Sequence, residues 1–270
     1  MILPVSGGRH ARLLLVTGSV SLIAPLNSTM VAVARPDIRA DFGASIVAAS
    51  FLVTSYLVAV AVAQPVGGRL GDAFGHVRVL RGALVLMALF SVLAALATTF
   101  PLLVAARCAQ GLAAALLMPN AMAYLRKQVP GQRLAGALGA LGVAIGAGAA
   151  AGPIVGGLVM EAGSWRWMFA VNIPLALVAS AGVWSLRADG GPGLSTLRAH
   201  WSSLGALVAA FTGLALAGSG IRAGVLEASG AFLLCAAGVT AYVALYRRQG
   251  DGVVDLRLFG RATFAAPAGL

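Results

Sequence analysis

The chain of 270 residues is 60% hydrophobic and 10% charged, with a mean hydropathy of +0.93. Soluble domains carry about a quarter charged residues, so this composition excludes a soluble globular protein. The formal net charge of +11 does not indicate a nucleic-acid partner, because the basic residues are spread singly or in pairs between apolar runs.

Eight long apolar windows lie between the charged residues. A helix that spans a bilayer needs about 20 such residues, and each window is close to that length. Lipid offers no partners to backbone polar groups, and the alternating pattern of a membrane barrel is absent, so we predict an all-α polytopic membrane protein. In chain order the windows are 13–34, 42–68, 82–106, 108–125, 134–160, 167–186, 201–221 and 228–246.

The basic residues indicate how the chain is oriented. Fourteen of the nineteen Arg and Lys residues fall on the side of the N-terminus, four fall on the other side, and Arg107 lies between the third and fourth windows. Loops on the cytoplasmic side of a membrane are enriched in Arg and Lys. We therefore expect a multi-pass protein of the cell membrane with a cytoplasmic N-terminus.

The longest polar connection is predicted to divide the chain. It contains a run of glycines and a proline at 190–193, and it separates six windows from two. We expect a six-helix bundle over 1–186, a cytoplasmic connection over 187–200 and two further transmembrane helices over 201–246. A cytoplasmic segment follows over 247–270, and a ninth apolar run begins within it.

The first window carries three consecutive polar residues, Asn27, Ser28 and Thr29, at about its middle. Polar side chains at this depth either line a cavity or make hydrogen bonds between helices. The sequence leaves both interpretations open.

The segment 67–78, between the second and third windows, is predicted to be a tight cytoplasmic loop. Glycines at both ends, with Gly68 and Gly75 among them, allow a sharp turn. Asp72 can occupy the positive end of a helix or pair with arginines such as Arg78. The loop is therefore either an ordinary basic turn or a charge clasp that acts as a cytoplasmic gate.

Arg107 is the ionisable residue that falls inside a predicted span. A break at 98–101 separates the third span from the fourth, which places Arg107 about two helical turns inside the fourth span. Arginine at mid-bilayer is unfavourable by roughly 2.5 to 3.5 kcal/mol, so it either snorkels to the interface or faces a polar pathway. Gln110 and Asn120, in the same helix, favour the polar pathway.

Glycines at spacing four mark the fifth window. Gly148, Gly152 and Gly156 fall on one helix face, where another backbone can approach closely. Pro153 removes a backbone hydrogen bond and bends a helix. Close helix packing and a hinge are equally compatible with this pattern.

Three tryptophans stand at window ends, namely Trp165, Trp167 and Trp201. Tryptophan is enriched at the two membrane interfaces, so these residues are predicted to be interfacial anchors.

An enzyme is not predicted. The windows contain no His, Asp or Glu that would serve as a base, an acid or a metal ligand, and His10, His76 and His200 lie at window edges. No cofactor or metal is expected.

Several of these motifs together resemble the major facilitator superfamily, and within it the fourteen-helix drug/proton antiporters. The segment 68–75 is similar to the superfamily signature between its second and third helices, and 103–115 is similar to its fourth-helix motif. The segment 148–157, which includes Gly157, resembles the fifth-helix motif of antiporters. Residues 165–169, followed by 172–174, are typical of the fourteen-helix drug exporters.

The resemblance also has departures. The family pattern has an aspartate where this chain has Asn27, and it has basic residues where this chain has Ala73 and His76. Because that aspartate is expected to help couple protons, its replacement bears on the coupling mechanism and not on the fold. The family has fourteen helices, whereas eight windows are present here.

The resemblance implies a proton-coupled exporter of small hydrophobic molecules, cationic ones included, that works by alternating access. The 270 residues are expected to be the N-terminal six-helix facilitator bundle plus two further helices of such an exporter. Arg107, Gln110, Asn27 and Asn120 are then the transport and coupling residues, and the glycines of the fifth window with Pro153 form the hinge or packing face. A truncated membrane partner or regulatory fragment that does not transport is the alternative.

Overall fold

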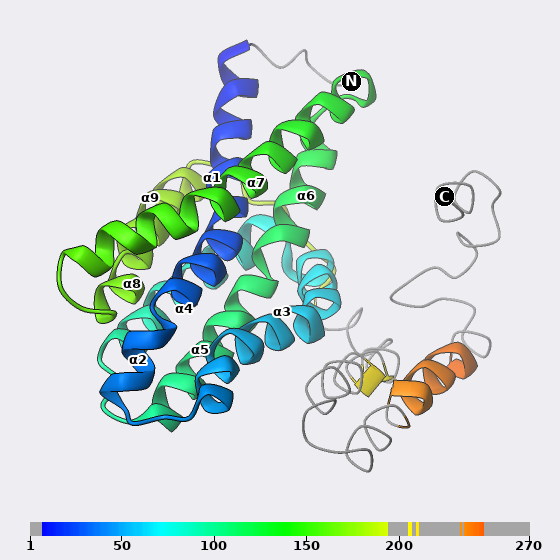
Figure 1. The fold of residues 1–270 in the computed structure, drawn as a ribbon. Helices are drawn as coiled ribbons and strands as arrows, with labels where there is room; N and C mark the ends of the chain where they lie inside the picture. Colours follow the sequence, from blue (N-terminus) through cyan, green and yellow to red (C-terminus); the bar gives the residue numbers. More distant parts are fainter. Residues whose placement is uncertain (1–6, 194–204, 207–208, 211–232, 234, 246–270) are drawn as a thin grey trace, which may run out of the picture. The chain divides into compact units, whose positions relative to one another are not determined.

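The computed structural model describes residues 7–193, 205–206, 209–210, 233 and 235–245, and every regular element in these ranges is helical. Residues 7–193 form nine helices (Figure 1). A further short apolar helix covers Cys235–Leu245. The helices are α1 (Gly7–Val33), α2 (Arg35–Asp41), α3 (Ile46–Phe74), α4 (His76–Ala95), α5 (Phe100–Ala115), α6 (Leu117–Gln128), α7 (Gly131–Glu161), α8 (Arg166–Ala170) and α9 (Asn172–Trp184).

Six stretches in this part of the chain are long and apolar enough to cross a membrane. The fourth consists of α5 followed by α6, and the sixth of α8 followed by α9. The six correspond in order to the first six predicted windows, which confirms an all-α polytopic fold. The predicted seventh and eighth helices lie largely, and the ninth apolar run entirely, outside the described residues. The spans are His10–Val33, Ile46–Phe74, His76–Ala95, Phe100–Gln128, Gly131–Glu161 and Arg166–Trp184.

The predicted loop at 67–78 is wrong. Here α3 continues to Phe74, and α4 begins at His76, so a single residue connects the two helices. Gly67 serves helix packing, because a Cβ at this position would lie 2.8 Å from the backbone oxygen of Ala115. We refer to the segment Gly67–Arg78 as the α3–α4 corner.

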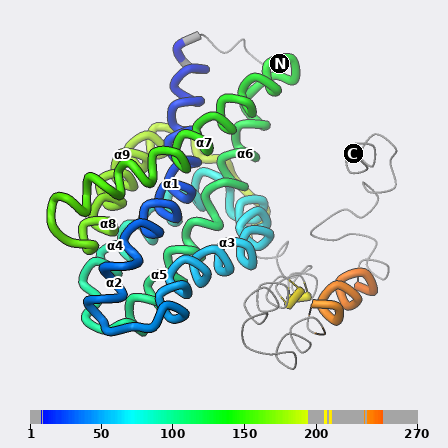
Figure 2. The backbone as a smooth tube through the Cα atoms, in the orientation of Figure 1, coloured from blue at the N-terminus to red at the C-terminus, as the bar shows by residue number. Residues whose placement is uncertain are grey.

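Contacts divide the chain into two compact units, Met1–Gly193 and Leu194–Leu270. Within the first unit, α1 packs most extensively against α7, α3 against α5, and α4 against both α9 and α5. Figure 2 traces this arrangement, with α1 in dark blue beside α7 in green. Helices far apart in the sequence are therefore neighbours in the bundle.

Two apolar clusters fill the bundle, one toward each end. The first includes Val20 of α1 and Met87 of α4, and the second includes Met30 of α1 and Ala94 of α4. Between them, the same helices and α5 and α9 carry buried polar side chains. We call this set the polar layer; it consists of Asn27, Ser91, Arg107, Gln110 and Asn172.

Candidate functional site

Arg107 lies at the centre of the polar layer, about two turns after α5 begins at Phe100, as the sequence predicted. Its side chain is fully buried. Nε donates a hydrogen bond to the backbone oxygen of Leu52 at 3.2 Å, and Nη1 donates to Oδ1 of Asn27 and to Oε1 of Gln110, each at 3.0 Å. The guanidinium therefore connects α5 with α1 and α3.

Two aromatic rings flank this guanidinium. Its Cζ lies 4.2 Å from the ring centre of Tyr56 and 5.9 Å from that of Phe169. The face of an aromatic ring attracts a cation, which offsets part of the penalty for burying it. None of the ion pairs in the described part of the chain involves Arg107. The charge is therefore stabilised by rings, amides and a carbonyl.

Two residues that the sequence analysis did not select as site residues complete the layer. Oγ of Ser91 accepts a hydrogen bond from Nε2 of Gln110 at 2.8 Å, and Nδ2 of Asn172 donates to Oδ1 of Asn27 at 3.4 Å. Their signal in the sequence is weak, since each is a single polar residue within an apolar run. The structure thus joins α1, α4, α5 and α9 through one hydrogen-bonded set.

Three buried atoms of the layer have no hydrogen-bond partner within the described residues. They are Nη2 of Arg107, Nδ2 of Asn27 and Oδ1 of Asn172. Leaving such a group unpaired is unfavourable by about 1 to 3 kcal/mol, so most proteins avoid it. A permanent charge with unpaired neighbours at mid-depth makes this layer the candidate functional centre. No group of three His, Cys, Asp or Glu residues that would hold a metal ion occurs in the part of the chain described.

Asn120 does not join the polar layer, although the sequence analysis grouped it with Arg107. Its Nδ2 donates to the backbone oxygens of Gly67 and Leu116, at 2.9 and 2.7 Å. Its Oδ1 lies 2.9 Å from Nδ1 of the buried His76. Asn120 therefore links α6 to the α3–α4 corner.

The corner turns at Gly75, whose φ of +95° is a conformation that other residues rarely adopt. Gly68 is half-buried within α3, and Arg78 is exposed on α4. The ion-pair partner of Asp72 in the described chain is His76 rather than Arg78, with 3.8 Å between Oδ1 and Nε2. The structure thus does not bring together the predicted gate pair of Asp72 and Arg78.

The carboxylate at the N-terminus of α4 is Asp189 and not Asp72. Oδ1 of Asp189 accepts a hydrogen bond from the backbone N–H of Val77 at 3.0 Å, and Oδ2 lies 3.5 Å from Nζ of Lys127. Burial raises the pKa of Asp189, but hydrogen bonds from the backbone N–H groups of Val77 and His76 outweigh burial and hold this pKa below its ordinary value. No local pattern reveals this contact, because 112 residues separate Asp189 from Val77.

The glycines of α7 face α1. Gly148, Gly152 and Gly156 are buried, and a Cβ at each would lie within 3.2 Å of an atom of α1. Gly157 has open space around it, and Pro153 is exposed within a helix that continues past it to Glu161. These contacts favour the packing interpretation, and a hinge at Pro153 stays a prediction.

An aromatic and ionic cluster lies near the connection between α7 and α8. Oδ2 of Asp41 accepts hydrogen bonds from Nε1 of Trp165 at 2.9 Å and from Nη1 of Arg166 at 3.1 Å. Trp165 is 3% exposed because Phe42 and Phe169 pack against its ring, so its prediction as an interfacial anchor is wrong.

The outcome is different for the other two tryptophans predicted to be interfacial anchors. Trp167 is 58% exposed, which leaves it free to contact the interface. Trp201 lies outside the described residues.

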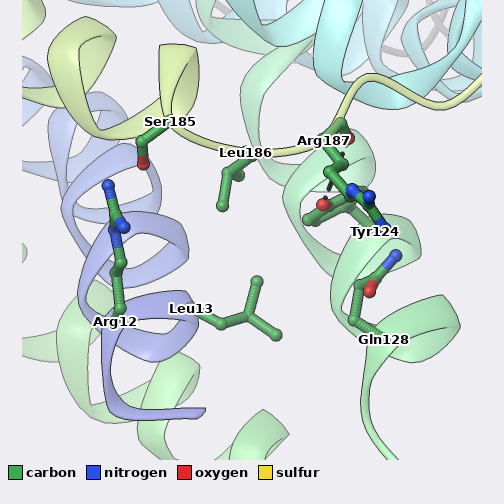
Figure 3. A pocket seen from close by; sticks show the side chains of 7 residues that line it. All are labelled: Arg12, Leu13, Tyr124, Gln128, Ser185, Leu186 and Arg187. Carbon is green, nitrogen blue, oxygen red and sulfur yellow. Dashed lines mark hydrogen bonds between the residues drawn. The ribbon is translucent and has the colours of Figure 1, made fainter. Parts of the chain in front are cut away.

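A small cavity lies between α1, α6 and the residues that follow α9 (Figure 3). The hydroxyl of Tyr124 donates a hydrogen bond of 3.3 Å to the backbone oxygen of Arg187 at its wall. Its volume is about 110 Å³, whereas drug-sized ligands occupy roughly 300–1,000 Å³. The cavity is therefore too small to be the substrate site. Its lining residues are Arg12, Leu13, Tyr124, Gln128, Ser185, Leu186 and Arg187.

Six apolar spans of bilayer length around a buried polar layer define a multi-pass membrane protein. Residues 17–266 match the sequence profile of the Major Facilitator Superfamily, and the chain belongs to this family. It is a family of membrane transporters, and the relatives of this chain include drug and antibiotic exporters.

Two relatives from Streptomyces illustrate the similarity. The chain is 32% identical to the probable actinorhodin transporter of Streptomyces coelicolor over 261 residues, which cover 89% of this chain and 43% of that protein. It is 36% identical to the tetracenomycin C resistance and export protein of Streptomyces glaucescens, over 65% of this chain and 33% of that protein. The chain therefore spans less than half the length of these relatives.

A solved structure shows the same fold. The xylose transporter XylE from E. coli, in an inward-open conformation, superposes with a TM-score of 0.58 at 17% identity. The match covers 83% of this chain and 55% of XylE. At this identity the similarity concerns the fold alone.

Proposed function

We propose that this protein exports small hydrophobic molecules, neutral or cationic, from the cell by alternating access with proton coupling. The observation that carries the proposal is the buried Arg107 with its unpaired neighbours in the polar layer. A charge is expensive at mid-membrane depth and is characteristic of substrate and ion pathways there.

The relatives support the proposed direction of transport and the proposed class of substrate. One is named for transport of actinorhodin, and another for resistance to tetracenomycin C and its export. Export of toxic or secreted small molecules is therefore the proposed direction. The apolar surfaces of the helices beside the polar layer suit hydrophobic substrates, which bind mainly by burial of apolar area.

We propose a cytoplasmic location for the N-terminus and for the α3–α4 corner. The basis is the excess of Arg and Lys on that side of the spans, fourteen against four. In this orientation the polar layer lies about halfway across the bilayer, and the aromatic cluster around Trp165 lies at the outer end.

Proton coupling is proposed to occur away from Asn27. The amide of Asn27 contacts Arg107 directly, but an amide does not bind and release a proton near neutral pH. The other buried members of the polar layer are serine, glutamine and asparagine. A titratable group at a helix edge, or one outside the described residues, is thus required.

The function is tested in everted membrane vesicles that contain the protein. A fluorescent hydrophobic dye is added, and its uptake into the vesicles is followed after a pH gradient is imposed. We expect uptake that collapses when an uncoupler dissipates the gradient, and vesicles without the protein serve as the control. Equal uptake with and without the protein contradicts the proposal.

A further inference from the structure

His76 is a buried histidine at the start of α4, with 1% of its surface exposed. Its Nδ1 lies 2.9 Å from Oδ1 of Asn120. Nδ2 of Asn120 is within hydrogen-bond distance of two backbone carbonyls, which only accept, so the amide nitrogen faces them and the amide oxygen faces the ring. Nδ1 of His76 therefore carries a hydrogen and donates it to Asn120.

Gly71 keeps this hydrogen bond in place. A Cβ at this position would collide with both Oδ1 of Asn120 and Nδ1 of His76. Because glycine has no side chain, the ring of His76 and the amide of Asn120 can meet in the space beside Gly71. The histidine is held in one orientation by α3 on one side and α6 on the other.

Nε2 of the same ring has no hydrogen-bond partner among the residues that the structure describes. In the neutral ring, with the hydrogen on Nδ1, this nitrogen presents a buried lone pair. Oδ1 of Asp72 lies 3.8 Å away, which is too far for a hydrogen bond but within ion-pair distance. The side chain of Asp72 is 55% exposed, so it connects the buried nitrogen with solvent.

The charged groups around the ring come from each neighbouring element. Asp72 belongs to α3, Asp189 follows α9, Lys127 ends α6, and Arg78 is exposed on α4 itself. Asp189 is already occupied by the N-terminus of α4 and by Lys127. Asp189 also interacts with a charge on His76, so two carboxylates lie near the ring, and Asp72 is the exposed one of the two.

We propose that Nε2 of His76 is a proton-binding site that is reached from solvent through Asp72. A proton taken from water bonds to the lone pair of Nε2, no bond of the protein breaks, and the α3–α4 corner gains one positive charge. Asp72 balances that charge by an ion pair between α3 and α4 that is absent when the ring is neutral. Histidine is a common proton-binding side chain in proteins that respond to pH.

The consequence for transport rests on the function proposed above. The proton would strengthen the contact between α3 and α4 at the end of the bundle that we place in the cytoplasm. Movement of this corner during alternating access would then depend on cytoplasmic pH. The site would supply a titratable group that the polar layer around Asn27 lacks.

Nitrogen NMR of the full chain in lipid nanodiscs tests the site directly. The chain contains three histidines, His10, His76 and His200, and the signals of His76 are assigned by their loss in His76→Asn. The amide of this variant still donates to Asn120, so the corner keeps its hydrogen bond. We expect hydrogen on Nδ1 alone at pH 8 and on both ring nitrogens at pH 5.

Substitution of the carboxylate provides the matched comparison. In Asp72→Asn less hydrogen should be found on Nε2 at pH 5 than in the parent protein, because the balancing charge is lost. Asp37→Asn, at an exposed position on α2, should leave the amount of hydrogen on Nε2 unchanged. A ring that stays neutral from pH 8 to pH 5, or equal amounts of hydrogen on Nε2 in both variants, overturns the proposal.

Dye transport in vesicles separates this proposal from the proposed function. We expect the pH profile of transport to flatten in His76→Asn. Titration of His76 in a protein that does not transport supports the proton site and contradicts the exporter. Transport together with a ring that never titrates contradicts the proton site and supports the exporter.

Discussion

Oδ1 of Asn27 lies 3.0 Å from Nη1 of Arg107, so a neutral amide meets the buried guanidinium. The same oxygen accepts a second hydrogen bond, from Nδ2 of Asn172 at 3.4 Å. One amide oxygen thus joins α1, α5 and α9. A carboxylate at position 27 would therefore bring a negative charge into direct contact with Arg107.

Asn27→Asp is expected to change the pH dependence of dye transport. The carboxylate would form a buried ion pair with Arg107 and would add a group that takes up and releases protons at mid-depth. The measurement is the initial rate in everted vesicles between pH 6 and about pH 8. Asn27→Ser, which is also neutral, is the control. Identical pH profiles for Asn27→Asp and the parent protein contradict this expectation.

Arg107→Lys is expected to abolish most transport although it keeps the charge. A single ammonium cannot reach Leu52, Asn27 and Gln110 together, whereas the planar guanidinium does. Loss of one or two of these charged hydrogen bonds should also lower the free energy of unfolding by about 3 kcal/mol. Dye transport and thermal unfolding in detergent measure the two effects. The exposed Arg133→Lys should change neither, and normal transport by Arg107→Lys would show that transport does not require the planar guanidinium.

Gly152→Ala is expected to destabilise the bundle, because the new Cβ collides with Oγ1 of Thr29 on α1. Overpacking of this kind is unfavourable by about 1 to 3 kcal/mol. Gly157→Ala, five residues further along the same helix, meets open space and should be neutral or slightly stabilising, since alanine is the better helix former. The melting temperatures in detergent compare the two variants. Equal melting temperatures for the two variants would show that the close contact of α7 with α1 does not require glycine at position 152.

Asp41 should stabilise the fold in a pH-dependent manner. Hydrogen bonds from Nε1 of Trp165, and then from Nη1 of Arg166, lower the pKa of Asp41 below 3.8. Because this pKa is lower in the folded protein, the stabilisation is present above about pH 4 and is lost as the pH falls through the folded pKa. The difference in melting temperature between the parent and Asp41→Asn should therefore be constant at neutral pH. It should shrink as the pH falls below about 4; a difference that stays constant on acidification contradicts the assignment.

Thiol labelling in intact cells tests the proposed orientation. Gln132 and Ala162 are exposed and lie at opposite ends of α7. With Cys108 and Cys235 replaced, Gln132→Cys should be shielded from an impermeant reagent, whereas Ala162→Cys should react. The reverse pattern would place the N-terminus outside the cell.

Much of the fold was predictable from local composition. Lipid imposes helices of a fixed minimum length, so the charge-free windows located six spans, and the break at 98–101 located the start of α5. For the same reason Arg107 was placed correctly at two turns of depth. Its contacts with Asn27 and Gln110 agree with the prediction that these residues belong to one polar centre.

The rest depends on contacts between distant segments. The glycines at 67–78 were interpreted as turn residues, but most of them allow helices to approach closely, and this requires knowledge of the partner helix. Asn120 was grouped with Arg107 because the two share a span, yet it lies three turns further along and meets His76 instead. Asp189 and the burial of Trp165 arise from loops packing against helix ends that are remote in sequence.

The alternation of apolar cluster, polar layer and apolar cluster fixes the axial register of the helices. A slide of α5 by one turn, about 5.4 Å, would carry Arg107 away from Asn27 and into the neighbourhood of Met30 or Ile23. Such a slide would leave the buried arginine without its hydrogen bonds, which is strongly unfavourable. The close contacts of the α7 glycines with α1 oppose sliding of those two helices as well. Sliding of one helix along its neighbour is therefore the motion that the bundle of residues 7–193 resists.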